Sequence, residues 1–324
     1  MKQRTLGKTG YSVSEIGLGT WQLGGDFGPV GDETASKILD AANAQGVNFW
    51  DTADVYGGGL SESRIGGHAK GADVKVATKL GRSSALFPDK YTKDGLRESL
   101  VGSARRLGVS KLDLAQLHCV PTAVMRDGKI FDWMDELQAE GLVAYYGASV
   151  ETVEEALMCL EHDGVASLQI IFNILRQDAA KELLPQAGEQ NVGIIVRLPL
   201  ASGLLSGKYD KNTQFDPSDH RNYNQDGAAF SVGETFSGIP FERGVELVQE
   251  LKGLAPQNVP LAQVALRWVL DHPQVSSVIA GVSKPEQIAD NVAASERGSL
   301  FPALMGQMAE WYEREVKPTI RGSV

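Results

Sequence analysis

Residues 47–59 read Val-Asn-Phe-Trp-Asp-Thr-Ala-Asp-Val-Tyr-Gly-Gly-Gly, a short apolar run that ends in an acidic residue and leads into a glycine-rich turn. Short apolar runs bounded by turn signals are typical of buried strands. Eight such runs occur along the chain, centred near Ile16, Phe49, Val76, Leu114, Tyr145, Ile170, Ile194 and Val278. The first seven centres lie 24 to 38 residues apart, which is the length of one strand and one helix.

Amphipathic helical segments lie between these runs. One example is Ala35/Ile38/Leu39/Ala42 and another is Leu261/Val264/Ala265/Trp268, each with apolar residues at helical spacing. Eight units predict a closed (β/α)8 TIM barrel, because an open doubly wound sheet uses fewer strands and a Gly-x-Gly-x-x-Gly turn that is missing here. We expect one domain over residues 1–324, with an N-terminal hairpin within residues 4–15 that plugs the barrel floor and extra C-terminal helices after Val278.

The interval between the last two runs, 84 residues long, breaks this rhythm. Its first part, residues 210–238, is rich in Asp, Asn, Gly and Ser, which predicts a long loop over the barrel mouth. Long ordered loops are usually functional, so we interpret it as a lid or substrate loop rather than surface decoration. We expect Trp21 and the aromatic residues Phe215, Tyr223 and Phe230 to line the pocket.

Composition disfavours several classes of protein. The chain has 41 acidic and 31 basic residues, and its net charge of -10 argues against a surface that binds nucleic acid. Neither an apolar run of 18 residues nor a secretory signal in residues 1–5 is present, so we expect no membrane segment and a cytoplasmic location. The two cysteines predict no disulfide framework, and the five histidines lack metal-ligand spacing, so we expect no metal site.

Four polar residues lie at strand ends, where a barrel of this kind carries its reactive side chains. They are Asp51, Tyr56, Lys79 and His118. A phenol is a poor acid at neutral pH, but a nearby ammonium group stabilises the phenolate and brings its pKa closer to the working pH. Tyr56 would then protonate a developing alkoxide, while Asp51 fixes Lys79 and His118 hydrogen-bonds the substrate oxygen. Since no side chain donates a hydride, the chemistry requires a nicotinamide cofactor.

Each of the four also has a purely structural interpretation. Asp51 would cap a helix, Tyr56 would be a turn aromatic, and Lys79 and His118 would be a solvated strand end and a core histidine. Their occurrence together at the ends of three consecutive strands favours the catalytic interpretation.

Residues 51–66 read Asp-Thr-Ala-Asp-Val-Tyr-Gly-Gly-Gly-Leu-Ser-Glu-Ser-Arg-Ile-Gly and resemble the signature of the aldo-keto reductases, including the branch related to potassium-channel β-subunits. Further motifs match in family order at residues 17–21, 78–79, 116–118, 199–208 and 281–287. The resemblance implies a (β/α)8 barrel with Asp51, Tyr56, Lys79 and His118 as the catalytic tetrad. It also implies an NADP(H) cofactor and a small carbonyl substrate.

The resemblance further implies where the cofactor binds. Ser149 and Gln169 would hold the nicotinamide carboxamide, and the segment from Pro199 to Lys208 would lie along the pyrophosphate. Ser283, Lys284 and Gln287 would bind the adenosine 2′-phosphate at a helix start, and Asn291 would contact the adenine. The full expected set is Thr20, Trp21, Ser149, Gln169, Arg197, Pro199, Leu200, Ser202, Gly203, Ser206, Lys208, Gly281, Ser283, Lys284, Gln287 and Asn291.

Three departures from the family pattern concern this site. Val150 stands where the family usually has Asn or Arg, and Cys119-Val120-Pro121 replaces a common Arg-x-Asp pattern. Arg197 replaces an aromatic residue that stacks on the nicotinamide, and its positive charge is unfavourable beside an oxidised ring. We therefore expect an unusual redox preference.

The leading prediction is NADPH-dependent reduction of small aldehydes or ketones to alcohols, with Tyr56 as general acid. The same residues would also run the reverse reaction, the oxidation of a polyol or sugar with NADP. A cofactor-sensing regulatory subunit is a further alternative, disfavoured because the resemblance implies that such relatives lack the histidine found at His118. A Schiff-base mechanism at Lys79 is a remote one. The sequence indicates neither the substrate nor the oligomeric state.

Overall fold

The structure, a computed structural model, describes residues 1–25, 27–28, 30–69 and 71–324. Eight parallel strands form a closed barrel in the order β10-β3-β4-β5-β6-β7-β8-β9. Their bounds are β3 Ile16–Gly19, β4 Phe49–Asp51, β5 Lys75–Leu80, β6 Leu112–His118, β7 Val143–Ser149, β8 Val165–Ile171, β9 Gly193–Arg197 and β10 Val275–Gly281. Each predicted apolar run contains one of these strands, so the predicted (β/α)8 barrel is confirmed.

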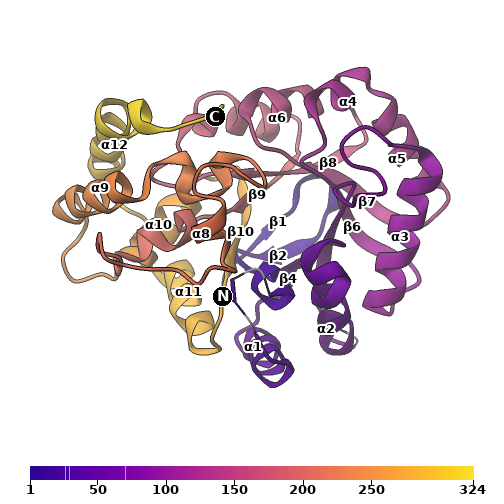
Figure 1. Ribbon diagram of the computed structural model, residues 1–324, viewed down its shortest axis with the longest axis horizontal. Helices are drawn as coiled ribbons and strands as arrows, with labels where there is room; N and C mark the ends of the chain where they lie inside the picture. Colours follow the sequence, from indigo (N-terminus) through magenta and orange to yellow (C-terminus); the bar gives the residue numbers. More distant parts are fainter. Residues whose placement is uncertain (26, 29, 70) are drawn as a thin grey trace.

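Helices surround the ring of strands (Figure 1). They are α1 Asp32–Ala44, α2 Leu60–Ala69, α3 Lys93–Leu107, α4 Thr122–Asp127, α5 Lys129–Ala139, α6 Val153–Cys159, α7 Leu183–Glu189, α8 His220–Tyr223, α9 Phe241–Leu254, α10 Leu261–Leu270, α11 Glu286–Glu296 and α12 Pro302–Trp311. In α1 the expected stripe of Ala35, Ile38, Leu39 and Ala42 is buried. The last helix, α12, packs beside α9 outside the barrel, as expected of an extra C-terminal helix (Figure 1).

Short helical turns complete the backbone, most of them in the loops at the barrel mouth. They are η1 Gly7–Thr9, η2 Trp21–Gly24, η3 Tyr56–Gly59, η4 Asp178–Ala180, η5 Ala201–Ser206, η6 Val232–Glu234, η7 Phe236–Gly238, η8 Tyr312–Val316 and η9 Lys317–Thr319. In the described part of the chain, no helix is long and apolar enough to cross a bilayer.

The N-terminal hairpin consists of β1 Gln3–Thr5 and β2 Ser12–Ser14, paired antiparallel. Its buried residues Leu6 and Val13 pack against Phe49 and other side chains inside the barrel. Arg4 donates hydrogen bonds to the carbonyl oxygens of Leu270 and Val275, at 2.6 and 2.8 Å, where β10 begins. The hairpin therefore covers the N-terminal end of the barrel, as predicted for a plug.

The strand register places the polar strand ends on one rim. Gly19 on β3 lies opposite Asp51 on β4, and Lys79 on β5 lies opposite Gln116 on β6. His118, Ser149 and Gln169 lie opposite one another on the next three strands, β6, β7 and β8. Because parallel strands all end on the same side, these residues gather at the C-terminal mouth of the barrel.

The long loop, residues 210–238, contains α8, η6 and η7 and is ordered by its own hydrogen bonds. The side chain of Asn224 accepts from the amides of Ala229 and Phe230, at 2.9 and 3.0 Å. Arg321, near the C-terminus, pairs with Asp226 at 2.6 Å and thereby ties the loop to the C-terminal segment. The loop is thus a folded element, and its contacts fix which of its residues face the barrel mouth.

Candidate active site

Four polar side chains meet at the mouth of the barrel. Lys79, almost fully buried, forms an ion pair with Asp51 and donates a hydrogen bond to the Thr52 carbonyl at 2.9 Å. Its Nζ also lies 3.2 Å from Oη of Tyr56. The imidazole of His118 meets the Tyr56 ring edge-on, with ring centroids 5.9 Å apart. The structure therefore brings together all four predicted catalytic residues.

A glycine-rich turn lets Tyr56 reach this position. Gly57 has a φ of 59°, and a Cβ atom on it would lie 2.4 Å from the carbonyl oxygen of Gly24. The close approach is possible only without a side chain, and it presses η3 against η2. As a result Trp21 on η2 stacks on the Tyr56 ring, with centroids 5.8 Å apart and planes 19° from parallel.

The surroundings set the protonation states of the three neighbouring groups. Burial alone would lower the pKa of Lys79, but the Asp51 carboxylate beside it raises that pKa above its usual value. Burial raises the pKa of Tyr56 and outweighs the opposing effect of the Lys79 ammonium. Burial, and next Lys79, hold the pKa of His118 well below its usual value. At neutral pH the site thus contains a protonated phenol, an ammonium ion and a neutral imidazole.

This result differs from the expectation that Lys79 brings the pKa of Tyr56 down toward neutrality. The ammonium does act in the expected direction, but the desolvation of the phenolate is the larger effect. The sequence could not predict how deeply the phenol is buried. Tyr56 is nevertheless in the protonated form that a proton donor requires, and the Lys79 ammonium opposes the effect of burial on its pKa.

Asp51 is held by two amide side chains. Gln169 Nε2 donates to its Oδ2 at 2.7 Å, and Gln116 Nε2 donates to the same oxygen at 3.3 Å. Gln169 was expected to hold a carboxamide, and in this structure its amide nitrogen is engaged by the carboxylate. Its role in fixing Asp51 was not predicted.

A cavity of about 310 Å³ extends from these residues to the start of α11. It is lined by all four predicted catalytic residues and by Thr20, Trp21, Ser149, Gln169, Arg197, Pro199, Leu200, Ser202, Gly203, Ser206, Lys208, Gly281, Ser283 and Gln287. Two residues of the expected cofactor set, Lys284 and Asn291, do not line it. Asn291 is buried in α11, and the side chain of Lys284 is exposed at the surface.

The inner part of the cavity offers polar atoms that suit a nicotinamide ring with its carboxamide. Within the described residues, Ser149 Oγ and Arg197 Nε are buried and have no hydrogen-bond partner. Both residues line the cavity next to Tyr56 and His118. Buried polar atoms of this kind are rare unless a ligand or water satisfies them.

The segment after β9 also suits a ligand that approaches the backbone. Leu198, Ala201 and Ser202 all have positive φ values, of 51°, 47° and 54°. Non-glycine residues adopt such values at an energetic cost and do so mostly at functional sites. This segment lines the middle of the cavity.

At the far end, the amides expected to face a phosphate are occupied by a side chain. Gln287 Oε1 accepts from the backbone amides of Ser283 and Lys284, at 2.8 and 3.0 Å. A bound phosphate would replace this amide oxygen or share the amides with it.

The long loop contributes cavity residues that were not predicted. Arg221 and Glu234 line the cavity, as does Tyr209 just before the loop. Phe215, Tyr223 and Phe230, which were expected to line the pocket, are not among its lining residues, although Phe230 packs against Trp21, which is. Phe215 packs against Tyr209, Phe236 and Phe241 instead. Composition indicated a loop over the mouth, but only its folded shape decides which side chains point inward.

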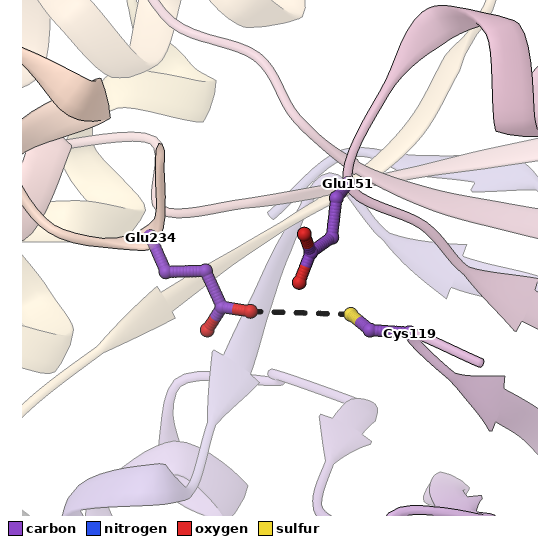
Figure 2. A group of neighbouring side chains, drawn as sticks. All are labelled: Cys119, Glu151 and Glu234. Carbon is purple, nitrogen blue, oxygen red and sulfur yellow. Dashed lines mark hydrogen bonds between the residues drawn. The ribbon is translucent and has the colours of Figure 1, made fainter. Parts of the chain in front are cut away.

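Cys119, which follows His118 in the sequence, forms a compact group with Glu151 and Glu234 (Figure 2). Their potential ligand atoms lie within 4.8 Å of one another. Two guanidinium groups are already bound there, since Glu234 Oε1 lies 3.2 Å from Arg82 and 3.8 Å from Arg197. A metal ion would be repelled by these cations, so we interpret the group as an ion-pair network.

Comparison with known proteins gives a consistent result. The profile of the Aldo/keto reductase family matches residues 15–313. A probable voltage-gated potassium channel subunit beta of Oryza sativa is 30% identical and aligns over 98% of this chain and 97% of its own length. The NADH-specific methylglyoxal reductase of Escherichia coli is 28% identical, over 97% of this chain and 100% of its own. Among solved structures, the glycerol dehydrogenase AKR11B4 from Gluconobacter oxydans has a TM-score of 0.79 at 27% identity, covering 99% of this chain and 98% of its own.

Proposed function

Because this chain belongs to the aldo/keto reductase family, we propose that it reduces small aldehydes or ketones to alcohols with NADPH, using Tyr56 as the proton donor. Family membership supports an oxidoreductase that uses a nicotinamide cofactor. The observation that carries the finer proposal is the contact between the Lys79 ammonium and Tyr56 Oη, 3.2 Å, at the wall of the cavity. A relative that is a methylglyoxal reductase supports a carbonyl substrate.

The roles of the side chains follow from their charges. Tyr56 gives its phenolic proton to the carbonyl oxygen as negative charge develops there, and the Lys79 ammonium stabilises the phenolate that remains. Asp51 keeps Lys79 in place and charged. His118, neutral at pH 7, donates a hydrogen bond to the same oxygen. A bound nicotinamide cofactor supplies the hydride for the carbonyl carbon.

Preference for NADPH over NADH is a separate part of the proposal. It is supported by Lys208 and Ser283 at the outer end of the cavity and by the nearby Lys284, which together offer cations and donors to a phosphate. The Escherichia coli relative named above is NADH-specific, so this preference has to be measured with both cofactors.

The direct test is Tyr56→Phe, which removes the proton and keeps the ring. We expect its kcat for NADPH oxidation with a panel of aldehydes to fall by at least about a hundredfold, the usual scale for loss of a general acid. Unchanged NADPH binding in a fluorescence titration is the control that the site remains folded. Full turnover by the variant would refute the proposed role of Tyr56.

Oxidation of a small alcohol is the second candidate, since a structural neighbour is a glycerol dehydrogenase. The same side chains serve that direction, with the phenolate of Tyr56 taking the alcohol proton. Specificity constants measured in both directions, with carbonyl and alcohol libraries, distinguish the two.

A further inference from the structure

Arg197 is a buried cation at the end of the cavity where the chemistry takes place. It lines the cavity together with Tyr56, His118 and Ser149, and only 8% of its surface is exposed. Its Nη2 donates to the Val150 carbonyl at 3.0 Å, which fixes the guanidinium at the wall. Its charge contributes to the lowered pKa of His118, after burial, Lys79 and Arg82, so the charge of Arg197 acts on the site.

A ring that exchanges a hydride with a substrate held by Tyr56 must lie within a few ångströms of that phenol. Arg197 lines the same cavity and interacts electrostatically with Tyr56, so it is close to such a ring. A nicotinamide is neutral when reduced and carries a positive charge when oxidised. An uncompensated guanidinium would then weaken binding of the oxidised form and leave the reduced form almost unaffected.

The compensating charge comes from Glu234, on the long loop. It lines the same cavity, is 6% exposed, and its Oε1 lies 3.8 Å from Arg197 Nη1 and 3.2 Å from Arg82 Nη1. Burial opposes ionisation of Glu234, but Arg197 and Arg82 hold its pKa below the usual value. Burial and then the charge of Glu234 raise the pKa of the neighbouring Glu151 (Figure 2). The negative charge of the pair thus resides mainly on Glu234.

We propose that Glu234 is a specificity-determining residue which, by neutralising Arg197, sets the relative affinity of the enzyme for the oxidised and reduced cofactor. This inference rests on the proposed use of a nicotinamide cofactor. The long loop then has an electrostatic role besides covering the mouth. It carries the carboxylate that offsets the charge of Arg197 beside an oxidised nicotinamide ring.

The test measures the dissociation constants of NADP⁺ and NADPH separately, by calorimetry for the first and fluorescence for the second. In Glu234→Gln, the ratio of the NADP⁺ constant to the NADPH constant should rise by about tenfold, since a net cation is left beside the ring. Glu151 can ionise once its neighbour is neutral, so Glu151→Gln/Glu234→Gln should raise the ratio further. In Arg197→Met, or Arg197→Gln if the first does not fold, the ratio should fall.

The opposite shifts of the ratio in Glu234→Gln and Arg197→Met separate an electrostatic role from a structural one, because a damaged site would weaken the binding of both cofactors equally. The double variant Arg197→Met/Glu234→Gln should return toward the wild-type ratio. Asp216→Asn is the matched control: it removes an exposed carboxylate of the same loop that lines no part of the cavity, keeps an oxygen that can accept from Ser218, and should leave the ratio unchanged.

Equal changes for the two cofactors in Glu234→Gln, or shifts of the same sign in Glu234→Gln and Arg197→Met, would overturn the inference while the proposed function stands. Failure of the wild-type protein to bind either cofactor would instead overturn the proposed function.

Discussion

At the scale of single residues, the chemistry of the site depends on which side chains keep their protons once those side chains are shielded from water. Lys79 and His118 are buried and Tyr56 is half-buried beside them, and desolvation and the Asp51 carboxylate leave the three as phenol, ammonium and imidazole. The cluster therefore contains one protonated phenol, one cation that would stabilise the phenolate, and one neutral hydrogen-bond donor. The residue types were evident from the sequence, whereas their protonation states followed only from the depth of burial.

Asp54, five residues before Gly59 in the same signature, provides a prediction for stability. Burial, and next the charge of Glu62, raise its pKa to about 7, and within the described residues its Oδ1 is buried without a hydrogen-bond partner. An unfolded Asp has a pKa of about 3.9, so the folded protein holds a proton that the unfolded chain releases. This contribution to stability is complete below about pH 4 and is lost as the pH rises toward about 7.

We therefore expect Asp54→Asn, which keeps the shape and removes the charge, to gain stability relative to wild type as the pH rises from 5 to 7. Above about pH 7 the gain should level off. Urea unfolding at pH 5, 6, 7 and 8 measures it, with Asp89→Asn, at an exposed position, as the control. A gain that does not depend on pH would contradict the raised pKa.

At the scale of elements, the strands were predictable and the long loop was not. Each barrel strand is a local apolar run, and the register of parallel strands then carries Lys79, His118 and Ser149 to one rim. Besides its own hydrogen bonds, the loop takes its shape from distant contacts, such as Arg321 with Asp226 and Asn173 Nδ2 with Ser237 Oγ. No periodicity within residues 210–238 encodes these contacts, so the cavity role of Glu234 was missed and that of Phe215 was wrongly expected.

The start of α11 carries the prediction for cofactor preference. Ser283 and Lys284 lie just before α11, and their own backbone amides are held by Gln287 Oε1. If Lys284 reaches a 2′-phosphate, Lys284→Ala should weaken NADPH binding by about tenfold, the scale of one hydrogen bond to a charged group, and leave NADH binding unchanged.

Fluorescence titrations with the two cofactors measure this difference. Lys37→Ala is the matched control, since Lys37 is an exposed lysine of α1 that pairs with Glu33 and lies away from the cavity. If Lys284→Ala weakened the binding of NADPH and NADH equally, or changed the binding of neither, Lys284 would not belong to the proposed phosphate site.

At the scale of the whole molecule, the cavity is lined by residues that follow the first and the last strand of the barrel. Thr20 follows β3, the first barrel strand, and Gln287 belongs to the helix after β10, the last one. These two strands pair to close the barrel, with Gly281 opposite Gly19. A cofactor that spans the cavity would contact both sides of this closure, so its binding should stabilise the entire barrel and not only the loops at the mouth.

The expected size of this effect follows from linkage. Free NADPH at 100 times its dissociation constant stabilises the folded state by about 2.7 kcal/mol. With an unfolding entropy of about 2.1 cal/mol/K per residue, a chain of 324 residues should then melt roughly 4 °C higher. Calorimetry with and without NADPH measures the shift, and adenosine monophosphate at the same concentration is the control ligand.

Tyr56→Phe should keep the full shift, because the phenolic oxygen acts in proton transfer rather than in cofactor binding. A protein whose melting temperature stays the same with both NADPH and NADH would contradict the proposed cofactor site, whatever the arrangement of the four polar residues at its inner end.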